Sequence, residues 1–265
     1  MKFRFQRKYL AIPYILFLLF FVVLPIILIV YYAFTDANGV FTFQNFLSFF
    51  QDSSKVNVLL YSFLFGFGNM AICLLIGYPI AAILANKNLN KNAVIVMLFV
   101  MPMWINFVIR TWATRDLLMW VGIDGGFHPY LATMIGLVYN YLPFTILPLY
   151  TTMLKMDRSQ LEAARDLGAN PVQTFLKVQL PMTMPGIVSA ATMVFMPTMS
   201  SYVISDILGE GKVTIFGKYI ETLFNQSDWN GGSMLALIML VLIGLSVLIT
   251  ERFEKNSEES RANIW

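Results

Sequence analysis

The chain has little charge, one cysteine and one histidine. Charged residues make up 12% of its 265 positions and hydrophobic residues 58%, whereas an ordinary globular domain has about 25% charged residues. This composition is typical of an integral membrane protein. The single cysteine, Cys73, excludes an intramolecular disulfide framework. The single histidine, His128, has no second histidine or cysteine with which to form a metal cluster, so we expect no metal site.

Motifs for nucleotide hydrolysis and for catalysis within a membrane are missing as well. A phosphate-binding GxxxxGK[ST] loop is absent, because the nearest match, around Gly211-Lys212, has Asp206 at the leading glycine position and Val213 at the Ser/Thr position. We therefore expect a protein that is not an enzyme and binds no cofactor itself. An intramembrane protease, the rival class, needs serine with histidine, or two histidines, inside its spans. A small structural membrane protein is a second rival.

Six stretches are long and apolar enough to cross a bilayer, which takes roughly 20 residues of helix. They cover residues 10–33, 57–84, 93–112, 130–153, 184–208 and 232–249. The first follows a basic segment that resembles the start of a signal peptide. Its apolar run is too long for one and lacks a small-residue cleavage site, so we expect it to be retained. The sequence predicts an all-α integral membrane protein, with residues 1–265 forming a single transmembrane domain.

The distribution of lysine and arginine predicts the orientation, because cytoplasmic loops are enriched in both. With the N-terminus inside, 13 of the 18 basic residues are cytoplasmic: Lys2, Arg4, Arg7, Lys8, Lys87, Lys91, Lys155, Arg158, Arg165, Lys177, Arg252, Lys255 and Arg261. Both termini are then cytoplasmic, as is the loop between the fourth and fifth spans. The basic residues are dispersed along the chain, so the net charge of +3 does not indicate a nucleic-acid partner.

That loop, residues 156–181, carries the signals of two short helices. Asp157 is a good N-cap, and Gln160 three residues later would complete a capping box. Gly168 is placed to end the first helix in the left-handed conformation, and Asn170-Pro171 is placed to begin the second. A capped helical pair at a membrane surface indicates a docking device for a soluble partner. The alternative is that the pair lies on its own membrane surface.

The same loop resembles the EAA motif of ABC importer permeases. The family pattern of Glu-Ala-Ala, a glycine and Ile-x-Leu-Pro is matched by Glu162-Ala163-Ala164, Gly168 and Val178–Pro181, with valine in place of isoleucine. The resemblance implies a coupling helix that fits a groove on a separate ATPase subunit, with Gly168 setting the angle between the two helices. The coupling residues it implies are Glu162, Ala163, Ala164, Gly168, Leu180 and Pro181.

The resemblance covers nearly the whole chain. Residues 77–85, 102–110, 135–150 and 201–209 are similar to segments of the permeases of spermidine/putrescine importers. This implies a type I ABC importer permease fold in a bacterial cytoplasmic membrane. It also implies four partners: lipid, a second permease subunit, two ATPase subunits that bind ATP and Mg, and an extracytoplasmic polyamine-binding protein. A permease for another small solute, such as an amino acid or an inorganic ion, is the alternative.

A path for polyamines should offer carboxylates for the ammonium groups and aromatic rings for cation–π contact. The candidates are Trp104, Asn106, Tyr139, Tyr202 and Asp206, together with the neighbouring Asn140 and Tyr141. Tryptophan and tyrosine near span ends are alternatively interfacial anchors, and Asp206 alternatively caps the end of its span.

Three further residues bear on this path. Pro102 lies two residues before Trp104 in the third span, and a proline within a membrane helix often marks a bend. Pro197 is a candidate hinge in the fifth span. Arg110 is expected to pair with a lipid headgroup or a carboxylate.

Overall fold

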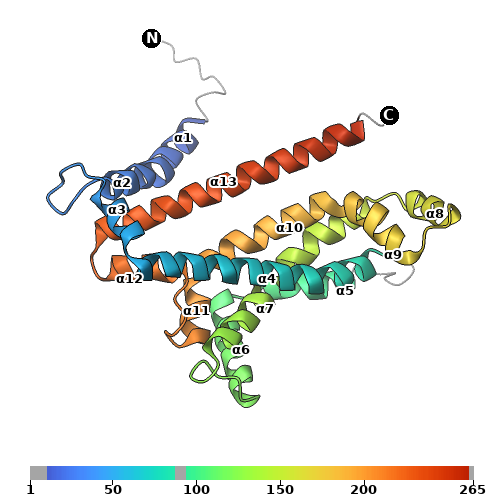
Figure 1. The fold of residues 1–265 in the computed structure, drawn as a ribbon, viewed down its shortest axis with the longest axis horizontal. Coiled ribbons are helices and arrows are strands. Elements are labelled where there is room, and N and C mark those ends of the chain that lie inside the picture. The colour runs from blue at the N-terminus through green and yellow to red at the C-terminus, as the bar shows by residue number, and fades with distance from the viewer. Residues whose placement is uncertain (1–10, 87–93, 263–265) are drawn as a thin grey trace, which may run out of the picture. The chain divides into compact units, whose positions relative to one another are not determined.

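The computed structural model describes residues 11–86 and 94–262 (Figure 1). Contacts divide the chain into two compact units, Met1–Val56 with Ile220–Leu242 (unit 1) and Asn57–Tyr219 with Ile243–Trp265 (unit 2). The prediction of a single domain stays a prediction. Several residues used above for spans and orientation lie outside the described residues: Lys2, Arg4, Arg7, Lys8, Leu10, Lys87, Lys91, Ala93 and the side chains of Lys255 and Arg261.

The described residues are almost entirely helical, and strand pairing among them is limited to one isolated bridge between Thr35 and Phe41. Five helices are long and apolar enough to cross a membrane: Ile12–Ala33, Ser53–Ala85, Pro129–Leu154, Pro171–Ser200 and Trp229–Arg252. A sixth candidate is the pair Val94–Trp104 and Phe107–Trp120, bent by 98°. The all-α fold class and its membrane helices are confirmed, but the third predicted span is broken.

Unit 1 contains α1 (Ile12–Leu18), the π-helical η2 (Leu19–Val23), α2 (Leu24–Ala33), α3 (Gln44–Gln51) and the first part of α13 (Trp229–Ala262). The loop after α2 is held by two amides, because Asn45 and Asn230 both donate to the carbonyl of Thr35, at 2.9 and 2.7 Å. The Val40 and Asn38 backbone N–H groups bond the Asp36 carboxylate and lower its pKa.

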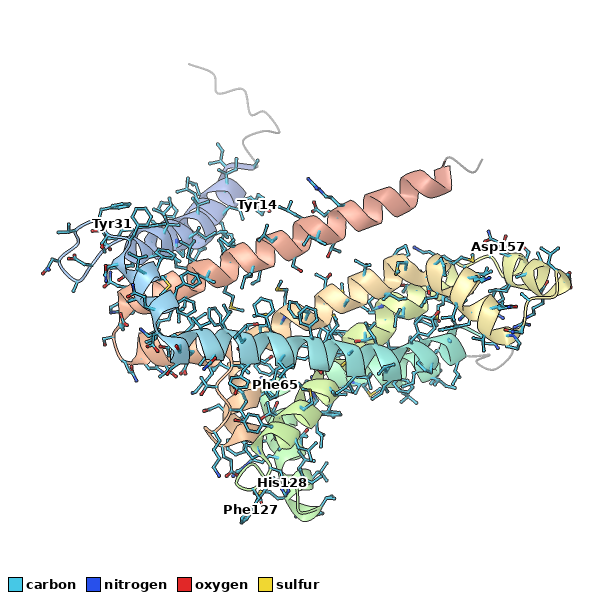
Figure 2. All side chains as sticks on the ribbon, viewed as in Figure 1. Tyr14, Tyr31, Phe65, Phe127, His128 and Asp157 are labelled. Atoms are coloured by element: carbon cyan, nitrogen blue, oxygen red, sulfur yellow. The ribbon has the colours of Figure 1, made fainter. Side chains whose placement is uncertain are left out.

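Unit 2 is organised around α7 (Pro129–Leu154), which packs against α5 (Val94–Val100), α6 (Phe107–Trp120), α10 (Leu180–Ser200) and α11 (Tyr202–Gly209). Most of α4 (Ser53–Ala85) and the start of α12 (Phe216–Asn225) also belong to this unit. Two buried apolar clusters share its core. One comprises Ala81, Leu84, Ala85, Val96, Ile146, Leu149, Met153 and Ala190; the other comprises Phe65, Ala132, Leu137, Ile204, Leu208, Val213 and Ile215. Phe65 is labelled in Figure 2.

Polar bonds and a glycine bring the helices of unit 2 close together. Asn69 on α4 donates to Thr198 Oγ1 on α10 at 2.7 Å, and both side chains are fully buried. Gly186 on α10 lies against α7, where an added Cβ would come within 2.6 Å of Thr152 Oγ1 and 3.1 Å of the Pro148 carbonyl oxygen. Small residues and interhelical hydrogen bonds are the usual basis of helix association in membranes, where apolar burial drives little.

The fifth predicted span differs from its expected limits at both ends. A continuous helix of 30 residues runs from Pro171 to Ser200 through α9 (Pro171–Thr174), the π-helical η4 (Phe175–Gln179) and α10. Pro181, which the sequence places at the end of the loop 156–181, lies inside this helix, so the loop ends earlier than predicted. A π-helical segment directly precedes it, as η2 precedes Pro25, and the wider turn accommodates a ring that would otherwise meet a carbonyl. The helix passes through Pro197 and stops at Ser201.

The Gly186 contact generates a stability prediction. We expect Gly186→Ala to lower the melting temperature of the purified membrane protein, because the new methyl group meets the backbone of α7. The matched control is Gly244→Ala, where an added Cβ meets no described atom within 4 Å and alanine favours helix by about 1 kcal/mol. Equal melting temperatures for the two variants would contradict the close approach of α7 and α10.

Candidate functional site

The loop between α7 and α9 folds as a compact helical hairpin, which we call the coupling hairpin (residues 156–174). Its first helix, α8 (Ser159–Asp166), ends in a left-handed glycine, because Gly168 has a φ of +84°. The Gly168 N–H donates to the Arg165 carbonyl at 2.9 Å, and the Ala169 N–H donates to the Ala164 carbonyl at 3.0 Å. These two bonds are the Schellman arrangement, so the predicted helix end at Gly168 is confirmed.

The capping box lies at the second helix of the hairpin, not at the first. Asn170 Oδ1 accepts the N–H of Gln173 at 2.8 Å, and the Gln173 side chain accepts the N–H of Asn170 at 3.1 Å. Asp157, labelled in Figure 2, accepts only the N–H of Ser159 among the described contacts, without a bond from Gln160. Sequence reasoning found the Asn170 cap but missed Gln173, although an amide three residues after the cap is the standard signal.

Arg158 joins the coupling hairpin to the end of α4. Its guanidinium donates to the Ala85 carbonyl at 2.8 Å and to Asn86 Oδ1 at 3.2 Å. An arginine there satisfies carbonyls that the end of a helix leaves free. Beside this contact lies a cavity of about 300 Å³, whose lining includes Glu162 and Gln179.

The predicted coupling residues lie in the coupling hairpin and at the start of α10. Glu162, Ala163 and Gly168 are exposed on the hairpin, and Ala164 is half-buried. Leu180 and Pro181 lie further along, in α10, half-buried and exposed respectively.

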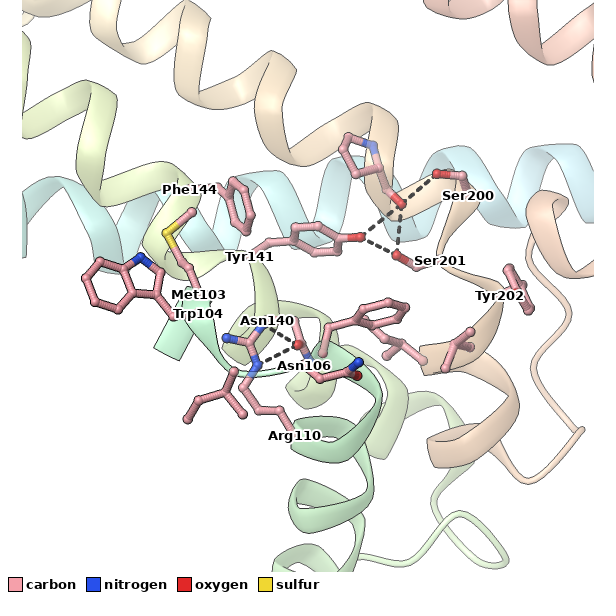
Figure 3. Close-up of a pocket in the computed structure, with 15 residues that line it drawn as sticks. Met103, Trp104, Asn106, Arg110, Asn140, Tyr141, Phe144, Ser200, Ser201 and Tyr202 are labelled. Carbon is pink, nitrogen blue, oxygen red and sulfur yellow. Dashed lines mark hydrogen bonds between the residues drawn. The ribbon is translucent and has the colours of Figure 1, made fainter. Parts of the chain in front are cut away.

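A second cavity, of about 530 Å³, opens where two helices of unit 2 break (Figure 3). We call it the broken-helix pocket. The first break separates η3 (Met101–Trp104) from α6, and the second, at Ser201, separates α10 from α11. α7 contributes Asn140, Tyr141 and Phe144 to the wall. Discontinuous helices that meet at a cavity are a recurrent design of substrate sites in transporters.

Arg110 holds the first break together. Its side chain donates from Nε and Nη2 to Asn140 Oδ1 at 2.9 and 2.7 Å, and from Nη1 to the Pro102 carbonyl at 2.6 Å. The residue is 7% exposed, and its guanidinium lies 5.5 Å from the centre of the Tyr139 ring. Its described partners are neutral protein groups, so the expected carboxylate partner is not found among the described residues. The other expected partner, a lipid headgroup, stays a prediction.

Hydroxyl groups hold the second break. The Pro197 carbonyl accepts bonds from Tyr141 Oη at 3.2 Å, Ser200 Oγ at 3.0 Å and Ser201 Oγ at 2.9 Å. Tyr141 Oη and Ser201 Oγ also lie within hydrogen-bonding distance of each other. Because each hydroxyl has one proton, a hydroxyl that donates to the other does not donate to the carbonyl at the same time. The break therefore lies just beyond the proline that the sequence indicated as a hinge.

The structure brings together three of the five predicted path residues. Trp104, Asn106 and Tyr202 line the broken-helix pocket, and Asn106 also caps α6 by accepting the Val108 N–H at 2.9 Å. The Tyr139 ring packs against the Arg110 guanidinium, and the Asp206 carboxylate pairs with Lys218 at 3.1 Å. Neither residue lines the pocket. Sequence reasoning missed Phe144, Ser200 and Ser201, because neither a phenylalanine in an apolar helix nor small hydroxyl residues near a proline carry a specific signal.

His128 lies in the loop before α7, where Figure 2 labels it. Among the described residues, no group of three or more His, Cys, Asp or Glu side chains is arranged to hold a metal ion.

The sequence of this chain matches a known protein family and several of its members. Residues 74–259 match the family model described as binding-protein-dependent transport system inner membrane component. The spermidine/putrescine transport system permease protein PotB of Escherichia coli (strain K12) is 34% identical over 259 residues, covering 88% of this chain and 92% of that protein. PotB of Haemophilus influenzae is 34% identical over 273 residues, covering 95% of each chain.

Solved structures share the fold. A bacterial alginate ABC transporter in complex with alginate pentasaccharide-bound periplasmic protein matches with a TM-score of 0.63 at 16% identity, covering 94% of this chain and 93% of that one. The MetNI methionine ABC transporter in an inward-facing conformation matches with a TM-score of 0.55 at 19% identity, covering 78% of this chain and 99% of that one.

The hairpin geometry predicts how Gly168 responds to substitution. An added Cβ meets no described atom within 4 Å, so the main cost of a substitution comes from the positive φ. We expect Gly168→Val to destabilise the helix end by about 1–2 kcal/mol, whereas Gly168→Asn costs less because asparagine tolerates this conformation. Hydrogen exchange of the peptide containing Ala169 measures the difference. Similar exchange in both variants would contradict the Schellman arrangement.

Proposed function

Because this chain belongs to the family of binding-protein-dependent transport system inner membrane components, we propose that it is the permease subunit of an ATP-driven importer of polyamines. The substrate assignment rests on the similarity to PotB proteins over almost the full length of both chains. The reaction is transport of spermidine or putrescine into the cytoplasm, and this subunit makes and breaks no covalent bond.

The broken-helix pocket supports this substrate class by its aromatic wall. Trp104 is 85% exposed and lies with Tyr141, Phe144 and Tyr202 around one cavity. The methylene chains of a polyamine pack on such rings, and its ammonium groups are attracted to the ring faces. A volume of about 530 Å³ is also in the range of small-molecule sites.

One helix links the two candidate sites of unit 2. The helix from Pro171 to Ser200 begins in the coupling hairpin and ends at the pocket. Its 30 residues span about 45 Å at a rise of 1.5 Å per residue. A displacement of the hairpin therefore moves the second break without passing through a flexible loop. This supports alternating access, in which the pocket opens to one side and then to the other.

The proposed assembly follows the family design. A second permease subunit of the same kind would pair with this one, two ATPase subunits would bind the coupling hairpins and hold ATP and Mg, and an extracytoplasmic polyamine-binding protein would deliver the substrate. We place the complex in a bacterial cytoplasmic membrane with both termini of this chain in the cytoplasm, as the distribution of basic residues favours.

The direct test is uptake of labelled spermidine by bacterial cells that lack polyamine importers. The chain is co-expressed with the transporter genes beside it in its own genome. We expect uptake that stops when the ATPase is inhibited with vanadate. An assembled membrane complex without spermidine or putrescine uptake would contradict the substrate assignment, and would direct the search to other small solutes.

Arg158 offers a test of the mechanical link. We expect Arg158→Ala to lower the number of spermidine molecules imported per ATP hydrolysed by roughly tenfold, because the variant loses charge-assisted bonds between the hairpin and α4. Uptake and ATP hydrolysis are measured together in reconstituted vesicles.

The matched control for this experiment is Lys155→Ala, which removes one exposed positive charge just before the hairpin. Equal losses in both variants would show that charge at the membrane surface, and not the contact with α4, controls coupling.

A further inference from the structure

The broken-helix pocket carries a positive charge in its wall. Of its fifteen lining residues, all of them in the described part of the chain, Arg110 is the one with a charged side chain. This is unexpected for a cavity that takes a substrate with several ammonium groups. The following inference rests on the proposed polyamine import.

The contacts of Arg110 orient its charge without neutralising it. Asn140 Oδ1 and the Pro102 carbonyl, which accept its hydrogen bonds, are both neutral groups. Two other basic side chains of unit 2 differ in this respect. Arg115 faces Glu210 at 2.9 Å and Lys218 faces Asp206 at 3.1 Å, whereas no ion pair of Arg110 is formed with a described carboxylate.

The helix ends around the pocket add to this charge. The first turns of α6 and α11 line it through Asn106, Phe107 and residues 202–204, and a helix N-terminus carries a partial positive charge. The carbonyls at the opposing helix ends accept bonds from protein donors, that of Pro102 from Arg110 and that of Pro197 from three hydroxyl groups.

A transporter needs a site that binds its substrate strongly enough to admit it and weakly enough to release it. Aromatic rings attract the ammonium groups here, and the guanidinium repels them. We propose that the positive charge of Arg110 keeps a bound polyamine weakly held, so that each transport cycle releases it.

The charge can be neutralised at two positions without removing Arg110. Asn106→Asp places a carboxylate in the pocket wall and retains the cap of α6, since aspartate caps helices as well as asparagine does. Asn140→Asp places a carboxylate on the guanidinium itself, although it loses the bond that Asn140 Nδ2 donates to the Gly136 carbonyl. Asn38→Asp, in an exposed loop of unit 1, adds the same charge at a residue that does not line the pocket and is the control.

The experiment measures binding of labelled spermidine to the assembled importer without its binding protein, and the maximal uptake rate with it. We expect Asn106→Asp and Asn140→Asp to bind spermidine at least about tenfold more tightly, the usual effect of a close charge pair. Both should import more slowly at saturation, because release is retarded. Asn38→Asp should match the unaltered protein in both measurements.

Other outcomes overturn the inference in separate ways. Unchanged affinity in both pocket variants, or tighter binding in Asn106→Asp alone, would show that the charge of Arg110 does not set affinity. Tighter binding with an undiminished maximal rate would exclude a role in release. No uptake of spermidine by the unaltered importer would overturn the proposed function and, with it, this inference. Uptake by that importer with unchanged binding in the variants would overturn the inference alone.

Discussion

A helix that ends in apolar surroundings leaves N–H and carbonyl groups that need partners, and unit 2 has two helix breaks around one cavity. The side chains of the pocket satisfy several of these groups. Arg110 bonds the carbonyl of Pro102, Asn106 bonds the N–H of Val108, and the hydroxyls of Tyr141 and Ser201 bond the carbonyl of Pro197. These bonds stabilise two helix breaks beside the same cavity.

Using arginine for this purpose has an electrostatic consequence. An arginine at the centre of a membrane helix costs about 2.5–3.5 kcal/mol on insertion scales, and hydrogen bonds to neutral acceptors offset part of that cost while leaving the charge in place. A carboxylate partner would have satisfied the guanidinium and cancelled the charge as well. The same contact that supports the architecture therefore also sets the charge of the pocket wall.

The coupling hairpin and the pocket share one helix, from Pro171 to Ser200. This helix is uninterrupted although it contains three prolines after its first residue. Pro181 follows a π-helical segment, and Pro185 and Pro197 lie within α10. Proline tends to kink a helix, but packing against α7 and polar contacts such as Asn69 with Thr198 hold this one together. One helix therefore runs without an intervening loop from the hairpin to the second break.

The sequence alone determined the membrane helices and the ends of the hairpin helices, because both depend on residues close together in the chain. Apolar runs predicted where the membrane helices lie, because hydrocarbon accepts only such segments, and Gly168 and Asn170 predicted the hairpin, because caps involve residues three to five apart. The tertiary structure decided the 98° bend and the composition of the pocket. Arg110 reaches Asn140, and Asp206 turns to Lys218 instead of the cavity. These pairings join residues distant in the chain, and hydropathy records how polar a residue is but not which way it faces.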